Sequence, residues 1–415
     1  MLFFRRPDKS GQAVLTLFYI LIGLQILQGV YALLEGVRWL RMARKRLGVP
    51  VGFYAPRVAV ICACKGAEAG LEANLTALTR FDYPEYEIFF TLASADDPAR
   101  EVTERVAAQG KRPVHVVVAG PPQDCTEKVN NLRAAVEQVG EEFEVLVFAD
   151  SDGRPPRRWL QRLVAPLEDA ERGACTTFRW YLPERGGFWS AFAAAWNAPI
   201  ATLLGEHAHN FCWGGGTAIR RKTFHEVGAL DYWLGSASDD YSLTRALKDS
   251  GRRIYFVPEC LTPTLQDTTA RELVEFTNRQ IIITRVYWPA LWALSTLAHL
   301  SYCGALTYAL LVLLVLWRTG GTWMDVLLLT CAVPLLAAAK GYLRLIAVGE
   351  VLPEWKATLL AYSWAWTLLA PLVPFLYLWN SLVAVRTRRI RWRGITYELI
   401  SPNQTRIVHG GAGRG

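Results

Sequence analysis

The placement of long apolar stretches most constrains what this 415-residue chain can fold into. The stretch 13–34 is nearly uncharged and long enough to span a bilayer as one helix. Three more apolar blocks follow residue 290, at roughly 291–317, 324–348 and 357–385. Hydrophobic residues make up 52% of the chain, yet the region between these ends has a globular composition. The sequence therefore predicts an integral, multi-pass membrane protein with one large inserted domain.

Basic clusters beside these stretches predict their orientation. Five cations follow the first stretch: Arg38, Arg41, Arg44, Lys45 and Arg46. A second cluster of arginines lies at 386–393. Because basic flanks mark the cytoplasmic side, we expect the inserted domain and the tail to be cytoplasmic, at a bacterial inner membrane or an equivalent one. The net charge of +8 lies mostly in these flanks and favours contact with the bilayer. No basic-aromatic patch or finger motif indicates nucleic-acid binding.

The predicted crossings conflict with this orientation. Three full crossings after residue 290 would carry the basic tail to the other side of the membrane. We therefore expect one block to be re-entrant or interfacial, and 324–348 is the candidate because Pro334, Lys340, Gly341 and Arg344 interrupt it. The expected regions are a first transmembrane helix with its flank at 1–48, a cytoplasmic domain at 49–270, an interfacial segment at 271–290, transmembrane or re-entrant helices at 291–385 and a basic tail at 386–415.

The middle of the chain alternates buried strands with helical patterns. Apolar runs with β-branched residues predict strands at 57–64, 86–92, 114–118 and 145–149. Strands that alternate with helices indicate a parallel, doubly wound α/β sheet. No GxGxxG motif follows the first strand, so the sequence does not indicate a Rossmann dinucleotide site.

Two carboxylates, Asp150 and Asp152, follow the strand at 145–149. In an open α/β sheet, ligands bind at the carboxyl ends of the strands. Oxygen ligands at i and i+2 suit Mg²⁺ or Mn²⁺, which typically share such ligands with the phosphates of a substrate. Because Asp, Ser and Gly are also ordinary turn residues, a solvated turn is the alternative interpretation.

An ordered set of motifs carries a family resemblance. The set comprises Lys65-Gly66, Asn74-Leu75, Asp82-Tyr83-Pro84, Tyr86-Glu87, Asp96-Asp97-Pro98-Ala99, Lys128-Val129-Asn130-Asn131-Leu132, Asp150-Ser151-Asp152, Gly216-Thr217-Ala218-Ile219-Arg220 and Asp239-Asp240-Tyr241. It resembles the ceramide glucosyltransferases, within the inverting family 2 superfamily of glycosyltransferases, over roughly residues 57–290. The tail Arg391-Trp392-Arg393-Gly394 resembles membrane-bound members of that superfamily. The resemblance implies an α/β GT-A (Rossmann-like) nucleotide-sugar-binding domain inserted between transmembrane α-helices.

The resemblance also implies roles for single residues. The donor-binding residues would be Lys65, Asp96, Asp97, Lys128, Asp150, Arg279, Gln280 and Arg285. Asp97 would accept a hydrogen bond from the base or ribose of the donor. Alternatively, Asp96 would accept this hydrogen bond, and Asp97 would cap the next helix. Asp152 would bind the divalent cation, with Asp150 in support. Asp240, the second acid of its pair, would be the general base, and a helix N-cap is the alternative role.

One motif of the resembled family is incomplete. That family usually carries Q/R-x-x-R-W near the membrane, but here Ile283 and Thr284 follow Gln280 at the Arg and Trp positions. Arg279 or Arg285 would then have to supply the missing cation to the diphosphate. This departure bears on the acceptor more than on the donor reaction.

The resemblance implies an inverting transfer of a hexose, with glucose from UDP-glucose as the first expectation, to the hydroxyl of a ceramide-type membrane lipid in glycolipid biosynthesis. The expected partners are a nucleotide-sugar donor, a membrane lipid acceptor and the bilayer, with a divalent cation as cofactor. A processive polysaccharide synthase of the same superfamily is the first alternative. A non-catalytic membrane protein that binds a nucleotide-sugar is the second.

Overall fold

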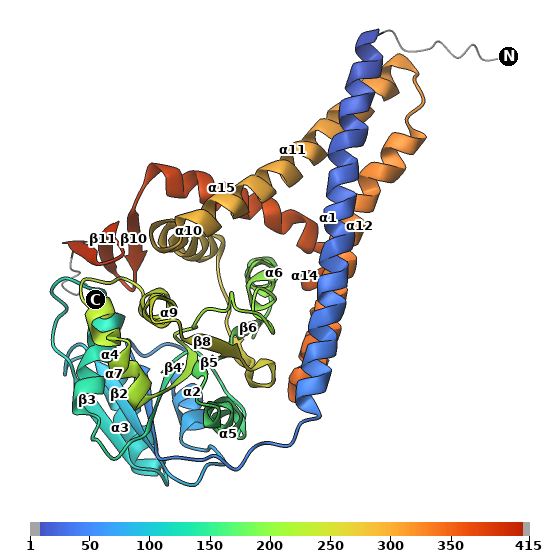
Figure 1. The fold of residues 1–415 in the computed structure, drawn as a ribbon. Helices are drawn as coiled ribbons and strands as arrows, with labels where there is room; N and C mark the ends of the chain where they lie inside the picture. The colour runs from blue at the N-terminus through green and yellow to red at the C-terminus, as the bar shows by residue number, and fades with distance from the viewer. Residues whose placement is uncertain (1–8, 410–415) are drawn as a thin grey trace.

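The computed structural model describes residues 9–409 and contains an α/β domain beside long helices (Figure 1). The domain is built on a seven-stranded sheet in the order β3-β2-β1-β4-β7-β5-β8. These strands are β1 (Val58–Ala63), β2 (Tyr86–Leu92), β3 (Val114–Val118), β4 (Val145–Asp150), β5 (Arg172–Thr176), β7 (Gly216–Arg220) and β8 (Arg253–Phe256). The first four lie where the sequence predicts them, to within a residue or so.

The sheet is mixed, so the prediction of a wholly parallel sheet is wrong. Strands β3, β2, β1 and β4 are parallel neighbours, but β7 runs antiparallel to both β4 and β5. In this pairing Ala149 lies opposite Gly216. A short apolar run reads the same in either direction, which is why composition alone cannot reveal this reversal.

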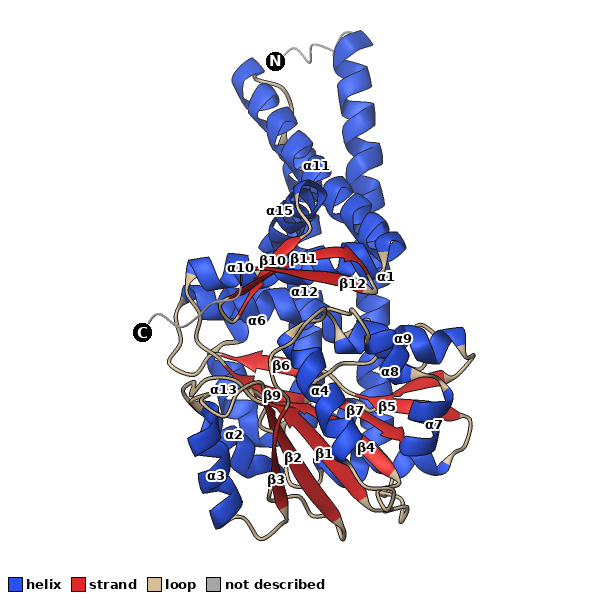
Figure 2. Ribbon diagram, turned by 90° about the vertical axis from the view of Figure 1, so that its left-hand side faces the viewer, coloured by secondary structure: helices blue, strands red, loops and turns tan. Residues whose placement is uncertain are grey.

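Helices cover both faces of the sheet (Figure 2). They are α2 (Leu71–Leu78), α3 (Ala99–Gln109), α4 (Glu127–Gln138), α5 (Trp159–Val164), α6 (Phe188–Ala201), α7 (Arg221–Glu226), α8 (Ala229–Trp233) and α9 (Asp239–Asp249). Along β1, Val58, Val60 and Cys62 join the core beneath α2, α3 and α5. The alternate residues Ala59 and Ile61 join the core beneath α4, α8 and α9. Burial on both faces explains the nearly continuous apolar strands.

Within residues 9–409, one α-helix precedes this domain and six follow it. They are α1 (Lys9–Leu47), α10 (Ala270–Tyr287), α11 (Pro289–Thr319), α12 (Met324–Val351), α13 (Lys356–Ala361), α14 (Ser363–Leu368) and α15 (Val373–Arg386). Within the described residues, four helical segments are long and apolar enough to cross a membrane: Gly11–Leu47, Pro289–Thr319, Met324–Val351 and Ser363–Arg386. Small sheets of β6 (Arg179–Leu182) with β9 (Thr262–Leu265), and of β10 (Arg389–Trp392), β11 (Ile395–Ser401) and β12 (Gln404–His409), complete the fold.

Helices α1 and α12 lie side by side and run in the same direction (Figure 1). Tyr19 donates to Asp325 near one end, and Arg44 pairs with Glu350 at 2.6 Å near the other. Both pairs are 306 residues apart in sequence, so the two helices keep one register along their length. Gly36 allows close approach, because a Cβ there would lie 2.9 Å from the Leu343 side chain. Small residues at such interfaces are typical of membrane helix pairs.

The arrangement of α11 and α12 bears on the predicted re-entrant block. Gln25 of α1 donates to Ser301 at 2.8 Å and Tyr308 donates to the Val14 carbonyl, so α11 runs antiparallel to α1, away from the domain. Helix α12 then returns to the domain as one helix through Pro334. Residues 324–348 thus belong to one continuous helix that is long and apolar enough to cross a membrane, and the re-entrant block stays a prediction.

The interrupted segment is instead the last apolar block. It is divided into α13, α14, a 3₁₀ turn at Ala370–Leu372 and α15. It starts after α12 has returned to the domain and ends at β10, whose sheet contacts the domain. There Arg393 donates to the Lys65 carbonyl at 2.6 Å, and Tyr397 accepts from the Glu127 amide at 3.3 Å. Residues 353–386 thus begin and end on the same side as the α/β domain.

We expect thiol labelling to reproduce this sidedness. Cys331 is the exposed cysteine, so Cys331→Ser gives a silent background in which the other seven cysteines are buried. Glu101→Cys in the domain and Arg406→Cys in the tail replace exposed side chains. Both should react with a membrane-impermeant reagent from one face of sealed vesicles, and Thr322→Cys, between α11 and α12, from the opposite face. Labelling of the tail together with Thr322→Cys would contradict the re-entrant segment.

Candidate active site

Four acidic residues and a lysine gather at the carboxyl edge of the sheet. Asp150 and Asp152 follow β4, as predicted, while Asp239 and Asp240 open α9. Lys128, in the first turn of α4, reaches Asp150 at 2.7 Å and Asp239 at 3.3 Å between nitrogen and oxygen. The sequence predicts Lys128 as a contact to uracil or phosphate, but in the structure its ammonium joins two carboxylates from different elements.

Burial and charge set the ionisation of this cluster. Burial raises the pKa of Asp239 to about 6, and the Lys128 ammonium opposes this shift. Burial acts on Asp150 in the same direction, but there the adjacent Lys128 ammonium prevails and lowers the pKa. Burial would lower the pKa of Lys128, yet the carboxylates of Asp150 and Asp239 raise it. The lysine therefore stays charged and holds Asp150 as a carboxylate.

The glycine run 214–216 lies directly against these acids. A Cβ on Gly214 would stand 2.1 Å from Asp239 Oδ2, and one on Gly215 would stand 2.5 Å from Asp150 Oδ2. Only glycine fits at such distances, so the run lets the backbone before β7 close one wall of the cluster. The sequence predicts close approach of this backbone to the sugar or acceptor, with a tight turn as the alternative interpretation.

Asp152 has the features of a cation ligand. Its Oδ1 is buried and has no hydrogen-bond partner within the described residues. Burial, and then the nearby Asp150 charge, raise the pKa of Asp152. No group of three or more His, Cys, Asp and Glu side chains with metal-site geometry occurs in residues 9–409. Mg²⁺ and Mn²⁺ can use one or two carboxylates together with phosphates, so the donor set fits such an ion.

Two arginines that the sequence analysis does not assign lie beside these acids. Arg179, on β6, approaches Asp152 at 3.8 Å and packs over the rings of Tyr181, Trp213 and Phe276. No motif surrounds Arg179, so sequence reasoning had no signal for it.

Arg393 is the second unassigned arginine. It lies at the β10–β11 turn with φ 45°, the one non-glycine residue with positive φ in the described chain. It pairs with Glu68 at 2.9 Å, and its charge acts on both Asp150 and Asp152. An αL backbone at an arginine is strained and persists at functional sites. The tail motif Arg391-Trp392-Arg393-Gly394 was the signal that could have assigned it.

Asp240 has one oxygen engaged and one free. Its Oδ1 accepts from the Ser238 hydroxyl and from the Tyr241 amide at 2.8 Å. Its Oδ2 accepts no hydrogen bond from any described residue. Ser238, whose hydroxyl accepts from the Tyr241 amide, is the N-cap of α9. Asp240 therefore supports the helix start and still presents one oxygen to a substrate.

The two arginines predicted to bind the donor from α10, Arg279 and Arg285, have different surroundings. Arg279 packs over the rings of Phe276 and Trp392, and burial together with the charges of Arg179 and Arg393 lowers its pKa to about 10. Arg285 instead donates to the Ala384 carbonyl and, at 3.3 Å, to the Val385 carbonyl at the end of α15. Because six residues separate the two arginines, their side chains leave the helix about 120° apart, and the donor role of Arg285 stays a prediction.

Gln280, next to Arg279, is half-buried on α10, and its side chain forms no hydrogen bond with the described residues. Nothing in the structure ties it to the acidic cluster.

The residues predicted at the nucleotide end occupy one loop region. Lys65 pairs with Glu127 at 2.7 Å, beside the carbonyl to which Arg393 donates. Asp97 Oδ1 accepts from the amides of Gly66 at 2.7 Å and Ala99 at 2.9 Å, so Asp97 joins the loop to the start of α3. Asp96 is exposed and its carboxylate has no partner in the described chain. The geometry favours the alternative assignment, with Asp96 free for a ligand.

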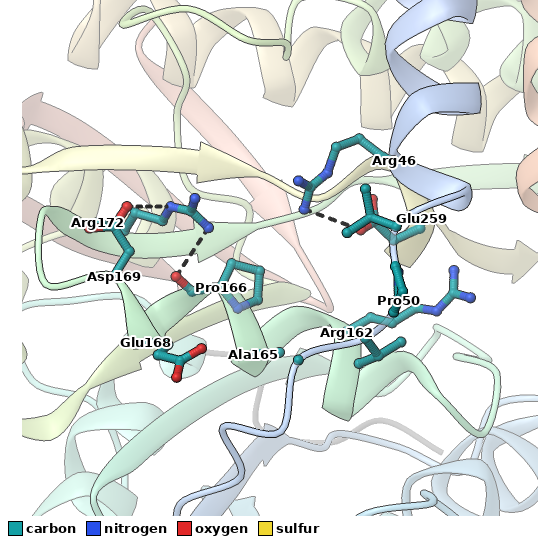
Figure 3. A pocket seen from close by; sticks show the side chains of 12 residues that line it. Arg46, Pro50, Arg162, Ala165, Pro166, Glu168, Asp169, Arg172 and Glu259 are labelled. Carbon is teal, nitrogen blue, oxygen red and sulfur yellow. Dashed lines mark hydrogen bonds and ion pairs between the residues drawn. The ribbon is translucent and has the colours of Figure 1, made fainter.

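A separate cavity of about 420 Å³ lies at the opposite edge of the sheet (Figure 3). Two ion pairs line it: Arg46 reaches Glu259 at 3.5 Å and Arg172 reaches Asp169 at 3.2 Å. It joins the end of α1 to the domain and contains none of the predicted site residues.

Comparison with known proteins identifies the family. The sequence pattern of glycosyl transferase family 21 matches residues 17–405. The chain belongs to glycosyl transferase family 21. This is a narrower assignment than the family 2 superfamily, and it makes the chain a glycosyltransferase with a GT-A-like domain.

Individual relatives are distant. Ceramide glucosyltransferase 1 of Caenorhabditis elegans is 23% identical over 231 residues, which cover 54% of this chain and 48% of that protein. Ceramide glucosyltransferase 3 of the same organism is 23% identical over 229 residues, covering 54% and 49%. The chain thus spans about half the length of these relatives.

Among solved structures, glucosyl-3-phosphoglycerate synthase of Mycobacterium tuberculosis with phosphoglyceric acid is 18% identical. It has a TM-score of 0.37 and covers 56% of this chain and 80% of its own.

We expect the raised pKa of Asp239 to appear in the pH dependence of stability. The folded chain keeps this proton up to about pH 6, whereas an unfolded aspartate loses it near about pH 4. Stability from this group therefore falls as pH rises through that window. In metal-free buffer, the melting temperature of the wild type should fall relative to that of Asp239→Asn across the window and then stay at a constant offset. An offset that does not vary with pH would contradict the shift.

Proposed function

We propose that this family 21 enzyme transfers a hexose, glucose from UDP-glucose, to the hydroxyl of a ceramide-type lipid at the cytoplasmic leaflet, with inversion at the sugar C1. The observation that carries this proposal is the cluster of Asp150, Asp152 and Asp240 with flanking cations, at the sheet edge that faces α10 and the membrane helices. The basic flanks of α1 and the tail support a cytoplasmic site. The distant ceramide glucosyltransferases support the acceptor class.

The donor's diphosphate would lie between the acids and the two unassigned arginines. Arg179 and Arg393 carry positive charge to the place where Asp150 and Asp152 end β4. Asp152, with Asp150 beside it, would hold Mn²⁺ or Mg²⁺, which supplies charge neutralisation for the leaving nucleoside diphosphate. The free carboxylate of Asp96 and the ammonium of Lys65 would meet the base and ribose at the other end of the cluster.

Asp240 would act as the general base through its free Oδ2. The acceptor oxygen forms a bond to C1 as the bond from C1 to the diphosphate oxygen breaks. The acceptor proton passes to Asp240 Oδ2, and the leaving diphosphate keeps the electron pair. The hydrogen bonds from Ser238 and Tyr241 to Oδ1 fix the direction of the carboxylate, which is the positioning that general base catalysis needs.

The acceptor's acyl chains would stay in the bilayer, because exposing each CH₂ to water costs about 0.8 kcal/mol. The site must then open toward the membrane surface. Helix α10 supports this arrangement, since it starts at a capping box of Thr269 and Glu272 and packs between the domain and helices α11 and α15. It corresponds to the segment 271–290 that the sequence predicts as interfacial.

A product assay tests the proposed function. Purified enzyme in vesicles should convert one of a panel of labelled sugar nucleotides to a labelled lipid, UDP-glucose first, with ceramide, diacylglycerol and a polycyclic lipid as acceptors. A labelled polymer would favour the polysaccharide synthase. Donor binding without any product, in every combination, would favour the non-catalytic alternative.

Replacing the base should separate chemistry from binding. Asp240→Asn keeps the shape and the contacts of Oδ1 but removes the basic oxygen, so turnover should fall by about 10²–10⁴-fold. Donor affinity, measured by calorimetry, should stay within a few-fold of the wild type and reports correct folding. Near-normal lipid glycosylation by Asp240→Asn would leave Asp240 as a helix-start residue only, with Asp239 the next candidate for the base.

Removing the cation should stop the reaction. Because Asp152 Oδ1 lacks any partner in the described chain, we expect full loss of activity in EDTA and recovery with Mn²⁺ or Mg²⁺. Asp152→Asn should weaken donor affinity and turnover together, while the melting temperature in EDTA should match that of the wild type. Undiminished activity in EDTA would refute the cation assignment.

A further inference from the structure

Arg344 of α12 is a buried cation without a counter-ion. Its side chain is 7% exposed, and its one hydrogen bond runs from Nη2 to the Thr202 hydroxyl, after α6, at 3.3 Å. Its Nε is buried and has no partner in residues 9–409. Lys340 lies one turn earlier, half-buried, and also forms no ion pair with the described residues. We call Lys340, Arg344 and Thr202 the α12 cation site.

This site lies at the headgroup level of the bilayer. The constant offset of 306 residues between α1 and α12 puts Lys340 level with Leu34, where the apolar stretch of α1 ends. The same offset puts Arg344 level with Arg38, the first residue of the basic flank. Both cations therefore sit where the phosphates of the leaflet on the domain side are found.

The side chains of the site face protein. Leu343 meets Gly36 of α1, and Gly341 meets the Trp366 carbonyl of α14. Lys340 and Arg344 lie on the helix face between these two contacts, toward the turn that contains Thr202. The nearby carboxylate of Glu35 already pairs with Arg38. Within the described residues, Arg38, Lys340 and Arg344 thus share this one nearby carboxylate, which leaves a surplus of positive charge at the site.

We propose that the α12 cation site binds the phosphate of an anionic phospholipid, wedged where α1 and α12 meet the end of α6. A buried guanidinium is costly without an anion, and basic pockets between membrane helices on the cytoplasmic side suit lipid phosphates. The phosphate accepts from the free Nε of Arg344 and from Lys340, and the acyl chains continue along α12. The bound lipid fastens α12 to the α/β domain. This proposal depends on the membrane helices and is independent of the sugar-transfer reaction.

The test compares lipid retention by native mass spectrometry. Full-length protein is delipidated in neutral detergent and incubated with phosphatidylglycerol or phosphatidylcholine. The wild type should retain phosphatidylglycerol preferentially. Arg344→Gln and the less buried Lys340→Gln should each lower that retention by about five-fold or more, the weight of one cation near an anionic surface. Arg41→Gln, an exposed cation of the same flank, is the matched control and should retain as much as the wild type.

Three outcomes would overturn the proposal. They are equal retention of the two lipids by the wild type, equal loss in Arg41→Gln and Arg344→Gln, and thermal stabilisation by inorganic phosphate that matches that of phosphatidylglycerol. The last would make the ligand a free anion. Elution of each variant at the wild-type volume on gel filtration shows that it is folded, and Lys340→Gln carries the test if Arg344→Gln does not fold.

Discussion

The ammonium of Lys128 between Asp150 and Asp239 is the interaction on which the site depends. It joins α4 to the end of β4 and to the start of α9, three elements that meet only in the folded domain. Without the lysine, two buried carboxylates would face each other unpaired, and breaking a buried ion pair in this way costs about 3–5 kcal/mol. The glycines at 214 and 215 belong to the same arrangement, since a side chain at either position would collide with these carboxylates.

The tail after α15 completes the candidate active site. Arg393 donates a hydrogen bond to the Lys65 carbonyl, and the Tyr397 hydroxyl accepts one from the Glu127 amide in the first turn of α4. The tail therefore lies against the same site as the carboxylates that follow β4. These contacts place the end of α15 and the tail beside the α/β domain. The strained αL backbone of Arg393 is held by its hydrogen bond to Lys65 and its ion pair with Glu68. The path of residues 353–386 is therefore linked to the completeness of the candidate active site.

Much of the fold and part of the site follow from the sequence for physical reasons. The strands β1 to β4 are buried on both faces and read as unbroken apolar runs, and the acids after β4 stand at the edge where ligands bind. The reversed strand β7 could not be predicted, because strand direction leaves no trace in the composition of five residues. Arg179 was missed for a similar reason: its partners Asp152 and Trp213 are distant in sequence. Arg279 and Arg285 could not be told apart from the sequence, because only the folded helix shows that their side chains point in different directions.

The direction of side chains on a helix also bears on the predicted re-entrant block at 324–348. A charge in a membrane helix argues against a crossing when it faces lipid, where no partner offsets its burial. In α12 the lipid side carries Leu335 and Tyr342, both exposed, while Arg344 faces Thr202. The block at 357–385 has no charge at all, yet Pro371 and Pro374 stand where its helices are interrupted. The Pro371 carbonyl accepts a hydrogen bond from the Tyr302 hydroxyl of α11, so this backbone group is paired with protein. Backbone that leaves a helix at membrane depth needs such partners, so a helix interruption there depends on neighbouring protein as well as on hydropathy.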